Sequence, residues 1–244
     1  MTHPLDYQKR IIIALDLENK DKGLALVGEL REARVFKVGL ELFTAEGPQL
    51  VKDIQALGKE VFLDLKLHDI PNTAAEAVRS GVRHGASMMT IHASGGYEMM
   101  AKAAEVARSE SEKRQTLKPL LLGVTILTSL KNEDLNSIGM VPDTAAQVLR
   151  LATLAKKAGM DGVVCSAQEI EIVREGAGPG FLIVTPGIRP AWAAAQDQKR
   201  IMTPAQAVEK GADYLVVGRP ITQAASPRDA FLKIVEEMRA QKPG

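Results

Sequence analysis

An aspartate and a lysine interrupt an otherwise apolar segment of the chain. Asp64 and Lys66 lie among leucines in EVFLDLKLHDIPNT (60–73). Because side chains alternate along a β-strand, residues two apart share a face, and these opposite charges are expected side by side. Asp69 follows just before Pro71, which cannot donate to a sheet, so the strand should end there. Buried ions are costly, so the pair predicts a charge-stabilising functional site; an ion pair that only fixes strand register is the alternative.

A second lysine extends this group of charges. Lys37 lies in VFKVG (35–39), where both neighbours are apolar. The pattern favours an inward side chain over an outward surface lysine. With Asp64, Lys66 and Asp69 it would form a compact, nearly neutral array that holds ions away from water.

Two arginines indicate an anion site elsewhere in the chain. Arg189 lies in GIRP (187–190) and Arg219 in VVGRPIT (216–222), after the seventh and eighth apolar runs. In barrels of eight parallel strands a phosphate site commonly follows strands seven and eight. Gly218 would let backbone N–H groups approach an anion, and Arg219 would bind it bidentately.

Other reactive side chains give weaker signals. His92 and Ser94 in IHASGG (91–96) lack partners at metal-ligand or nucleophile spacing, so we interpret them as structural. The other histidines are scattered, and the sequence requires no metal. Cys165, the only cysteine, lies in the apolar run GVVC (162–165) and is interpreted as a packed thiol.

Eight short apolar runs predict strands, and charged amphipathic segments between them predict helices. The expected strands are 11–16, 35–39, 61–66, 87–92, 121–126, 162–166, 181–186 and 214–218. The expected helices are 21–32, 44–57, 72–85, 97–109, 143–157, 167–175, 203–210 and 227–240. This alternation predicts an α/β fold, a (β/α)8 TIM barrel with a parallel eight-stranded core, as a single domain over 1–244. An open doubly wound sheet is the alternative, but the Gly-rich fingerprint expected after its first strand is absent.

Two segments fit neither period. The polar stretch 109–119 is expected to be a solvated connection from helix to strand, and 187–202 a long loop after the seventh strand, of the kind that often acts as a lid.

Composition argues against several classes of partner. There are 31 Lys plus Arg against 30 Asp plus Glu, and no basic run is interleaved with aromatics, so nucleic acid is not an expected partner. The longest apolar run, 119–127, is far shorter than the roughly 20 residues of a membrane helix. The polar start and the single cysteine favour a cytoplasmic protein without membrane contact.

Taken together, the motifs resemble those of the orotidine 5′-phosphate decarboxylase family in its bacterial form. They span nearly the whole chain: DLKLHDIPNT (64–73), HASGG (92–96), VTILTS (124–129), DQKRIMTP (197–204) and VVGRPIT (216–222). The resemblance implies a cytoplasmic homodimer with shared active sites. It also implies decarboxylation of orotidine 5′-monophosphate (OMP) to UMP and CO2, the last step of de novo UMP biosynthesis, without metal or organic cofactor.

The resemblance also implies residue roles. Lys66 would protonate C6 of the pyrimidine, and Asp64 would face the substrate carboxylate, either repelling it or orienting Lys66. Asp16 and Lys37 would hold ribose hydroxyls. Asp69 would reach the ribose and Lys66 of the other subunit. The remaining assignments are Ile70 and Thr73 beside that shared site, Thr128 at the pyrimidine, and Arg189, Gln198, Gly218 and Arg219 at the phosphate.

Three other functions fit parts of the pattern. Magnesium-dependent 3-keto-gulonate 6-phosphate decarboxylases share a D-x-K-x-x-D strand but carry a metal-binding Glu at the position of Lys37, where a cation would repel Mg²⁺. A Schiff-base aldolase would use Lys66 or Lys37 as nucleophile, although lysines paired with carboxylates are poor nucleophiles. A silent nucleotide-binding protein would need the phosphate site but not Asp64 and Lys66.

Overall fold

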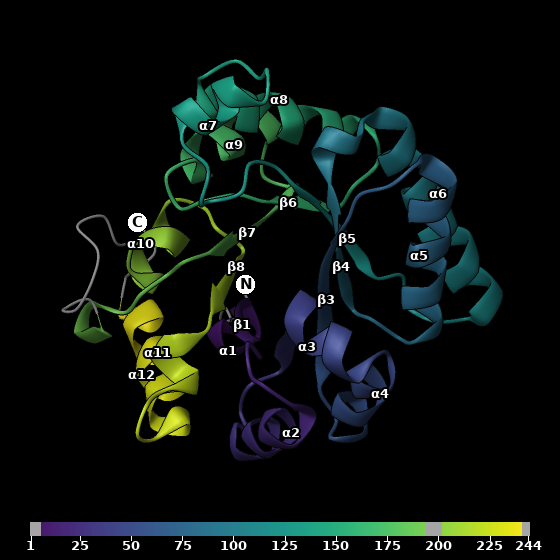
Figure 1. Cartoon of the computed structure of the whole chain (residues 1–244). Coiled ribbons are helices and arrows are strands. Elements are labelled where there is room, and N and C mark those ends of the chain that lie inside the picture. Colours follow the sequence, from purple (N-terminus) through teal and green to yellow (C-terminus); the bar gives the residue numbers. More distant parts are fainter. Residues whose placement is uncertain (1–5, 194–201, 241–244) are drawn as a thin grey trace, which may run out of the picture.

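The computed structural model describes residues 6–193 and 202–240, in which eight parallel strands close into a barrel (Figure 1). The strands are β1 (Ile11–Ala14), β2 (Val35–Gly39), β3 (Glu60–Leu67), β4 (Met88–His92), β5 (Leu120–Val124), β6 (Gly162–Val164), β7 (Leu182–Pro186) and β8 (Tyr214–Val217). Each pairs with its neighbours in sequence, and β8 pairs with β1 to close the ring. The predicted (β/α)8 barrel is confirmed.

Helices surround the barrel and connect its strands (Figure 1). The longer ones are α2 (Lys20–Glu29), α3 (Leu40–Glu46), α4 (Gln49–Ala56), α5 (Pro71–Arg83), α6 (Tyr97–Arg114), α8 (Thr144–Lys157), α9 (Ile170–Ala177) and α12 (Pro227–Arg239). The shorter ones are α1 (Tyr7–Arg10), α7 (Asn132–Ser137), α10 (Pro204–Glu209), α11 (Arg219–Thr222) and the 3-10 turns η1 (Ala93–Gly95) and η2 (Ala191–Ala193). None of the described helices is long and apolar enough to cross a membrane. A single domain over 1–244 stays a prediction.

The helix predicted over 44–57 is instead two helices. α3 ends at Glu46 and α4 begins at Gln49, with Gly47 and Pro48 between them. Gly47 has a φ of 70°, in the left-handed region that glycine adopts easily, and proline cannot continue a helix. The Gly-Pro dipeptide therefore breaks the segment in two.

The polar segment 109–119 was also predicted wrongly, because α6 continues to Arg114. Glu110 is buried in that extension, and it accepts hydrogen bonds from Arg79 Nη1 at 3.0 Å and Arg83 Nε at 2.8 Å. Both arginines lie on α5, about 30 residues earlier in the chain. Since local polarity cannot reveal such pairing, the sequence suggested a solvated connection where the protein has a packed helix.

Two apolar layers hold the barrel. The interior layer consists of Ile12, Ala14, Val35, Phe62, Met88, Leu122, Val184 and Val216. A larger layer fills the space between the strands and the surrounding helices. Lys37 and Asp64 lie two residues after Val35 and Phe62, so strand alternation places them on the interior face, nearer the carboxyl end. The fold thus directs both charges into the mouth of the barrel, where active sites of this architecture lie.

Candidate active site

Four charged side chains of alternating sign form a row across the first three strands. Lys37 Nζ lies 3.0 Å from Asp16 Oδ1 and 3.7 Å from Asp64 Oδ2, which in turn lies 2.9 Å from Lys66 Nζ. The Lys37 and Asp64 side chains are each only 11 % exposed. This geometry confirms the prediction that Lys37 points inward and that Asp64 and Lys66 are presented together. Because each charge has an opposite neighbour, the row can keep the Lys37 ammonium group buried, while the Lys66 side chain stays 35 % exposed at the cavity.

The backbone at Lys66 departs from a regular strand. Pairing of β3 with β4 shifts between Leu63 and Leu67, and Lys66 has a φ of 50° in the left-handed region. That conformation costs about 1–3 kcal/mol for a non-glycine residue and persists where surrounding contacts impose it. Thr90 on β4 supplies such contacts, because its Oγ1 accepts from Lys66 N at 2.9 Å and donates to Asp64 Oδ1 at 3.0 Å.

Gly39 is a site residue that sequence reasoning missed. A Cβ built on it would lie 3.0 Å from Lys37 Nζ and 3.5 Å from Asp16 Oδ1, so a side chain there would crowd the ion pair. The signal was available, since Gly39 ends the same strand two residues after Lys37 and therefore faces the same way.

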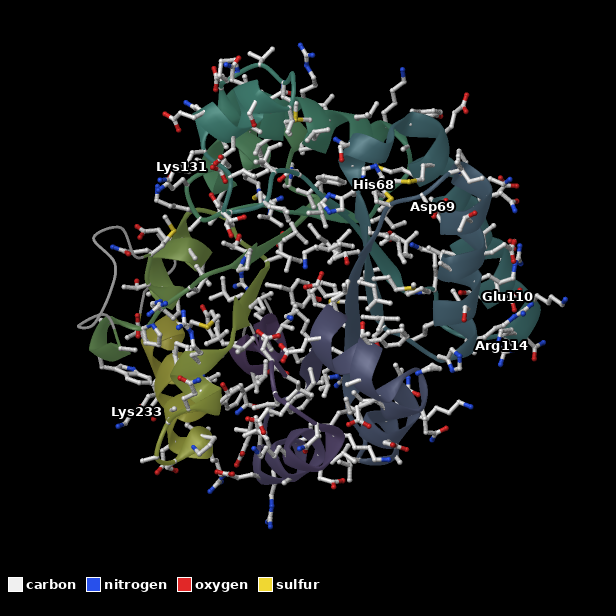
Figure 2. The ribbon with its side chains drawn as sticks, in the orientation of Figure 1. His68, Asp69, Glu110, Arg114, Lys131 and Lys233 are labelled. Atoms are coloured by element: carbon white, nitrogen blue, oxygen red, sulfur yellow. The ribbon has the colours of Figure 1, made fainter. Side chains whose placement is uncertain are left out.

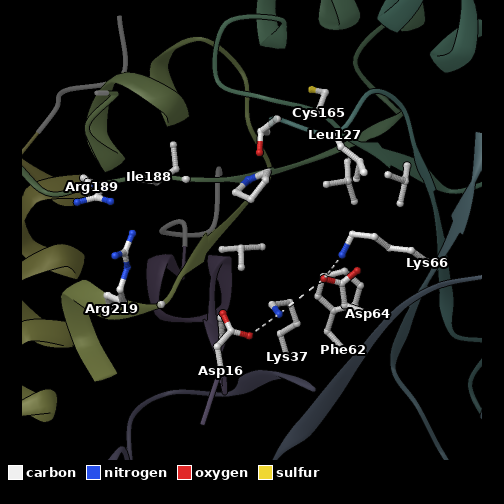
Figure 3. Close-up of a pocket in the computed structure, with 18 of the residues that line it drawn as sticks. Asp16, Lys37, Phe62, Asp64, Lys66, Leu127, Cys165, Ile188, Arg189 and Arg219 are labelled. Atoms are coloured by element: carbon white, nitrogen blue, oxygen red, sulfur yellow. Dashed lines mark hydrogen bonds and ion pairs between the residues drawn. The ribbon is translucent and has the colours of Figure 1, made fainter. Parts of the chain in front are cut away.

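The row of charges lines one side of a cavity of about 350 Å³ at the mouth of the barrel. Arg189 and Arg219 line the opposite side of the cavity from Lys66, where their guanidinium groups point toward each other (Figure 3). Thr128 and Gly218 line the same cavity. Its volume is within the roughly 300–1,000 Å³ of small-molecule sites. One end is thus suited to charge-dependent chemistry and the other to an anion.

The other predicted site residues lie apart from this cavity. Asp69, Ile70 and Thr73 are exposed and do not line it, and among the described residues Asp69 Oδ1 accepts only from the neighbouring Ile70 N, at 2.7 Å. Figure 2 shows Asp69 beside His68 on the α6 side of the molecule, away from the barrel centre. Gln198 falls outside the described residues. The ends of the 187–202 loop meet, because Arg189 N donates to the Met202 carbonyl oxygen at 3.2 Å.

His92 does not line the cavity, but it lies near enough to Lys66 and Asp64 to be affected by their charges. Its ring centroid is 5.4 Å from that of His68. Burial lowers the pKa of His92, and the nearby His68 and Lys66 lower it further, while Asp64 acts in the opposite direction. Burial and the two neighbouring groups that lower this pKa all favour the neutral imidazole. Within residues 6–193 and 202–240 no group of three or more His, Cys, Asp or Glu side chains is placed to hold a metal ion.

Cys165 is buried, as its apolar run predicted. Burial raises the pKa of its thiol to about 12, and the nearby Glu169 carboxylate adds to the rise. At pH 8 only about one thiol in 10⁴ is ionised, and the thiolate is the reactive form. We expect iodoacetamide at pH 8 to leave the folded protein unmodified by mass spectrometry and fully active, while protein unfolded in urea takes up one label. Rapid labelling of the folded protein would contradict this result.

Comparisons with known proteins point to one family. The family described as "Orotidine 5'-phosphate decarboxylase / HUMPS family" matches residues 9–234. Orotidine 5'-phosphate decarboxylase of Syntrophomonas wolfei is 50 % identical over 95 % of this chain and 98 % of its own length, and that of Pseudomonas aeruginosa strain PAO1 is 52 % identical over the same shares. The crystal structure of orotidine 5'-phosphate decarboxylase from Lactobacillus acidophilus superposes with a TM-score of 0.84 at 39 % identity, covering 95 % of this chain and all of that one.

These matches agree with the geometry of the site. The family match covers all eight strands and every described side chain of the charged row. Relatives of this identity extend over almost the whole of both chains. The chain therefore belongs to the orotidine 5′-phosphate decarboxylase / HUMPS family.

Proposed function

We propose that this chain decarboxylates orotidine 5′-monophosphate to UMP and CO2, the last step of UMP biosynthesis, with Lys66 as the proton donor. The reaction is the one named for its relatives, which makes the protein a carboxy-lyase. The observation that carries the assignment of roles is the row from Asp16 to Lys66, opposite two arginines in one cavity.

The chemistry requires charge rather than a conjugated acceptor. When the bond from C6 to the carboxylate breaks, CO2 leaves and the electron pair stays at C6, in the plane of the ring. No adjacent π system delocalises it. Lys66 Nζ stabilises that pair by its positive charge and then transfers its proton to C6, which gives UMP and a neutral amine. Fixed charge where charge develops is usually the largest catalytic contribution, and it acts best in a site that excludes water.

Asp64 has the role of holding Lys66 in line. Its Oδ2 accepts from Lys66 Nζ at 2.9 Å, and it also lies 3.7 Å from Lys37 Nζ. One carboxylate thus fixes both ammonium groups, which leaves Lys37 and Asp16 to bind ribose hydroxyls. Because Asp64 is hydrogen-bonded to Lys66, we infer that its main contribution is to orient the Lys66 ammonium group, rather than to repel the substrate carboxylate.

The phosphate binds at the arginine end of the cavity, with Thr128 beside the pyrimidine. A Cβ on Gly218 would make only an ordinary contact, 3.6 Å from Ala14 Cβ, so the protein's own packing does not demand glycine there. A bound phosphate would require glycine there, because its oxygens must come close to backbone N–H groups to accept hydrogen bonds from them. Binding energy gained at this remote group contributes to the reaction at C6 by positioning and desolvating the base.

Replacing Arg219 with alanine is expected to lower kcat/KM for OMP by about 10²-fold, since a hydrogen bond between charged groups contributes about 1.5–3 kcal/mol. The nucleoside orotidine has no phosphate, so its much slower decarboxylation should change by less than about twofold. Parallel assays of the two substrates make the comparison. Equal losses on both would refute the assignment of Arg219 to the phosphate.

We also propose that the reaction needs no metal or organic cofactor and takes place in the cytoplasm. The magnesium-dependent 3-keto-gulonate 6-phosphate decarboxylases are the nearest alternative. Lys37 supports the metal-free reaction, because by resemblance this cationic residue stands where those enzymes carry a metal-binding Glu. Mg²⁺ would have to approach that charge directly.

The decisive experiment uses EDTA-treated wild-type protein and OMP, with loss of the orotate absorbance as the signal. We expect rapid turnover that added Mg²⁺ does not change. Turnover only of 3-keto-gulonate 6-phosphate, and only with Mg²⁺, would establish the alternative. Tight UMP binding without any turnover would indicate a silent nucleotide-binding protein, and trapping of a carbonyl substrate by borohydride would indicate a Schiff-base enzyme.

We propose further that the protein is a homodimer whose active sites are shared. Asp69 and Ile70 lie between β3 and α5 and Thr73 in the first turn of α5; all three are exposed, none lines the cavity of its own subunit, and Ile70 is 66 % exposed. Such a segment is suited to reach the cavity of a second subunit, since a two-fold axis would bring each copy of it to the other site.

A further inference from the structure

Thr90 makes two hydrogen bonds to the most strongly charged part of the site. Its side chain lies on the interior face of β4, two residues after Met88 of the barrel core, and the residue is 1 % exposed. The hydroxyl accepts from the backbone N–H of Lys66 at 2.9 Å and donates to Asp64 Oδ1 at 3.0 Å. Donor and acceptor capacities are both in use, and both partners belong to β3.

These contacts lie where the sheet is irregular. Leu67 is four residues after Leu63 on β3, while their partners on β4, Met89 and Ile91, are only two residues apart in sequence, so β3 has two extra residues here. The extra residues of β3 lose their regular ladder partners, as they do at β-bulges. The Thr90 hydroxyl takes the place of a backbone carbonyl as acceptor for the Lys66 N–H. The lysine that carries the positive charge is therefore held in a left-handed conformation by a side chain of the next strand.

We propose that Thr90 is a positioning residue for the decarboxylation, acting through Asp64 and Lys66 without touching the substrate. Its donated bond fixes Asp64 Oδ1, which leaves Oδ2 directed at Lys66 Nζ. Its accepted bond fixes the backbone from which the Lys66 side chain starts. One hydroxyl thus sets both ends of the Asp64–Lys66 pair. The inference rests on the proposed roles of these two residues.

The experiment compares two replacements of Thr90. Thr90→Val has nearly the shape of threonine but neither donates nor accepts, whereas Thr90→Ser keeps the hydroxyl. We expect Thr90→Val to lower kcat for OMP by about 10- to 100-fold, because small displacements of reacting groups have effects of this size. KM and the Kd for UMP should stay within about threefold, since the phosphate and ribose contacts are untouched. Thr90→Ser should keep kcat within about threefold of the wild type.

Thr185 offers a matched control. It is a fully buried threonine on β7, its hydroxyl has no hydrogen-bond partner among the described residues, and it does not line the cavity. Thr185→Val makes the same chemical change in another strand of the same barrel, and we expect kcat within about twofold of the wild type. A fall in kcat for both valine variants would show a general effect of altering a buried strand.

The outcomes separate this inference from the proposed function. Absence of OMP turnover by the wild type would reject the proposed function. A crystal structure of Thr90→Val would still test the positioning role: Lys66 should leave its left-handed conformation, and a Lys66 that keeps it would contradict the role of Thr90. With an active wild type, kcat of Thr90→Val within twofold of it would overturn the role of Thr90. Equal losses in Thr90→Val and Thr90→Ser would assign the effect to packing. Thr90→Ala, which removes the hydroxyl without adding bulk, replaces the valine variant if that variant does not fold.

Discussion

Replacing Lys66 with alanine is expected to lower kcat for OMP by about 10⁴-fold or more, because the change removes the proton donor and the positive charge together. General acid catalysis contributes about 10²- to 10⁴-fold, and a preorganised charged or hydrogen-bonding group about 10²- to 10³-fold. The Kd for UMP should change much less, since the residues proposed to bind ribose and phosphate are mostly others. Steady-state decarboxylation and UMP titration measure the two quantities. Survival of more than a tenth of the activity would show that another group donates the proton.

Lys118 provides the matched control for this variant. Its side chain is 35 % exposed, the same as that of Lys66, and its Nζ pairs with Asp161 Oδ2 at 2.6 Å. It precedes β5, at the end of the barrel opposite the site. Lys118→Ala therefore removes an equally exposed, equally paired lysine without touching the cavity, and kcat should stay near that of the wild type. A loss in Lys118→Ala that matched the loss in Lys66→Ala would show that the assay reports folding.

The period of two along the strands explains how much of the site the sequence predicts. Once 35–39 and 61–66 are interpreted as strands with one face inward, Lys37 and Asp64 must enter the barrel, and both do. The same logic applied to β4 would have placed Thr90 inside with Met88, but a lone threonine in an apolar run carries no charge to draw notice. The strand pattern therefore predicts that Thr90 faces inward, but an uncharged hydroxyl does not by itself indicate a functional residue.

The irregular features depend on contacts that a strand pattern does not encode. The shift between Leu63 and Leu67 arises from pairing with β4, and it brings Lys66 to Asp64 by a left-handed residue rather than by simple alternation. The burial of Glu110 likewise depends on two arginines of another helix. Features of this kind become visible only when segments distant in the sequence are brought together.

The role of Asp69 cannot be read from the contacts within one chain, because its proposed target lies in a second copy of the chain. Replacing it with alanine is expected to lower kcat by about 10³-fold, as for the loss of one preorganised charge beside the reacting groups. The same loss would follow if Asp69 acted within its own subunit. Activity of the single variant therefore does not distinguish the two arrangements, although the exposure of Asp69 favours the shared one.

Hybrid dimers distinguish them. Lys66→Ala and Asp69→Ala subunits are co-expressed with different tags, and the hybrid dimer is purified by both tags. If the sites are shared, one of its two sites contains the intact Lys66 of one chain and the intact Asp69 of the other. Such dimers should recover about half of the wild-type activity per dimer, although each parent is nearly inactive. Lys66→Ala paired with Asp64→Asn is the control, since both changes lie in the row contributed by a single chain and every site stays defective. No recovery in the first hybrid would place Asp69 at the site of its own subunit. The Lys66→Ala subunit can supply its intact Asp69 to the site of its partner only if Asp69 crosses the interface.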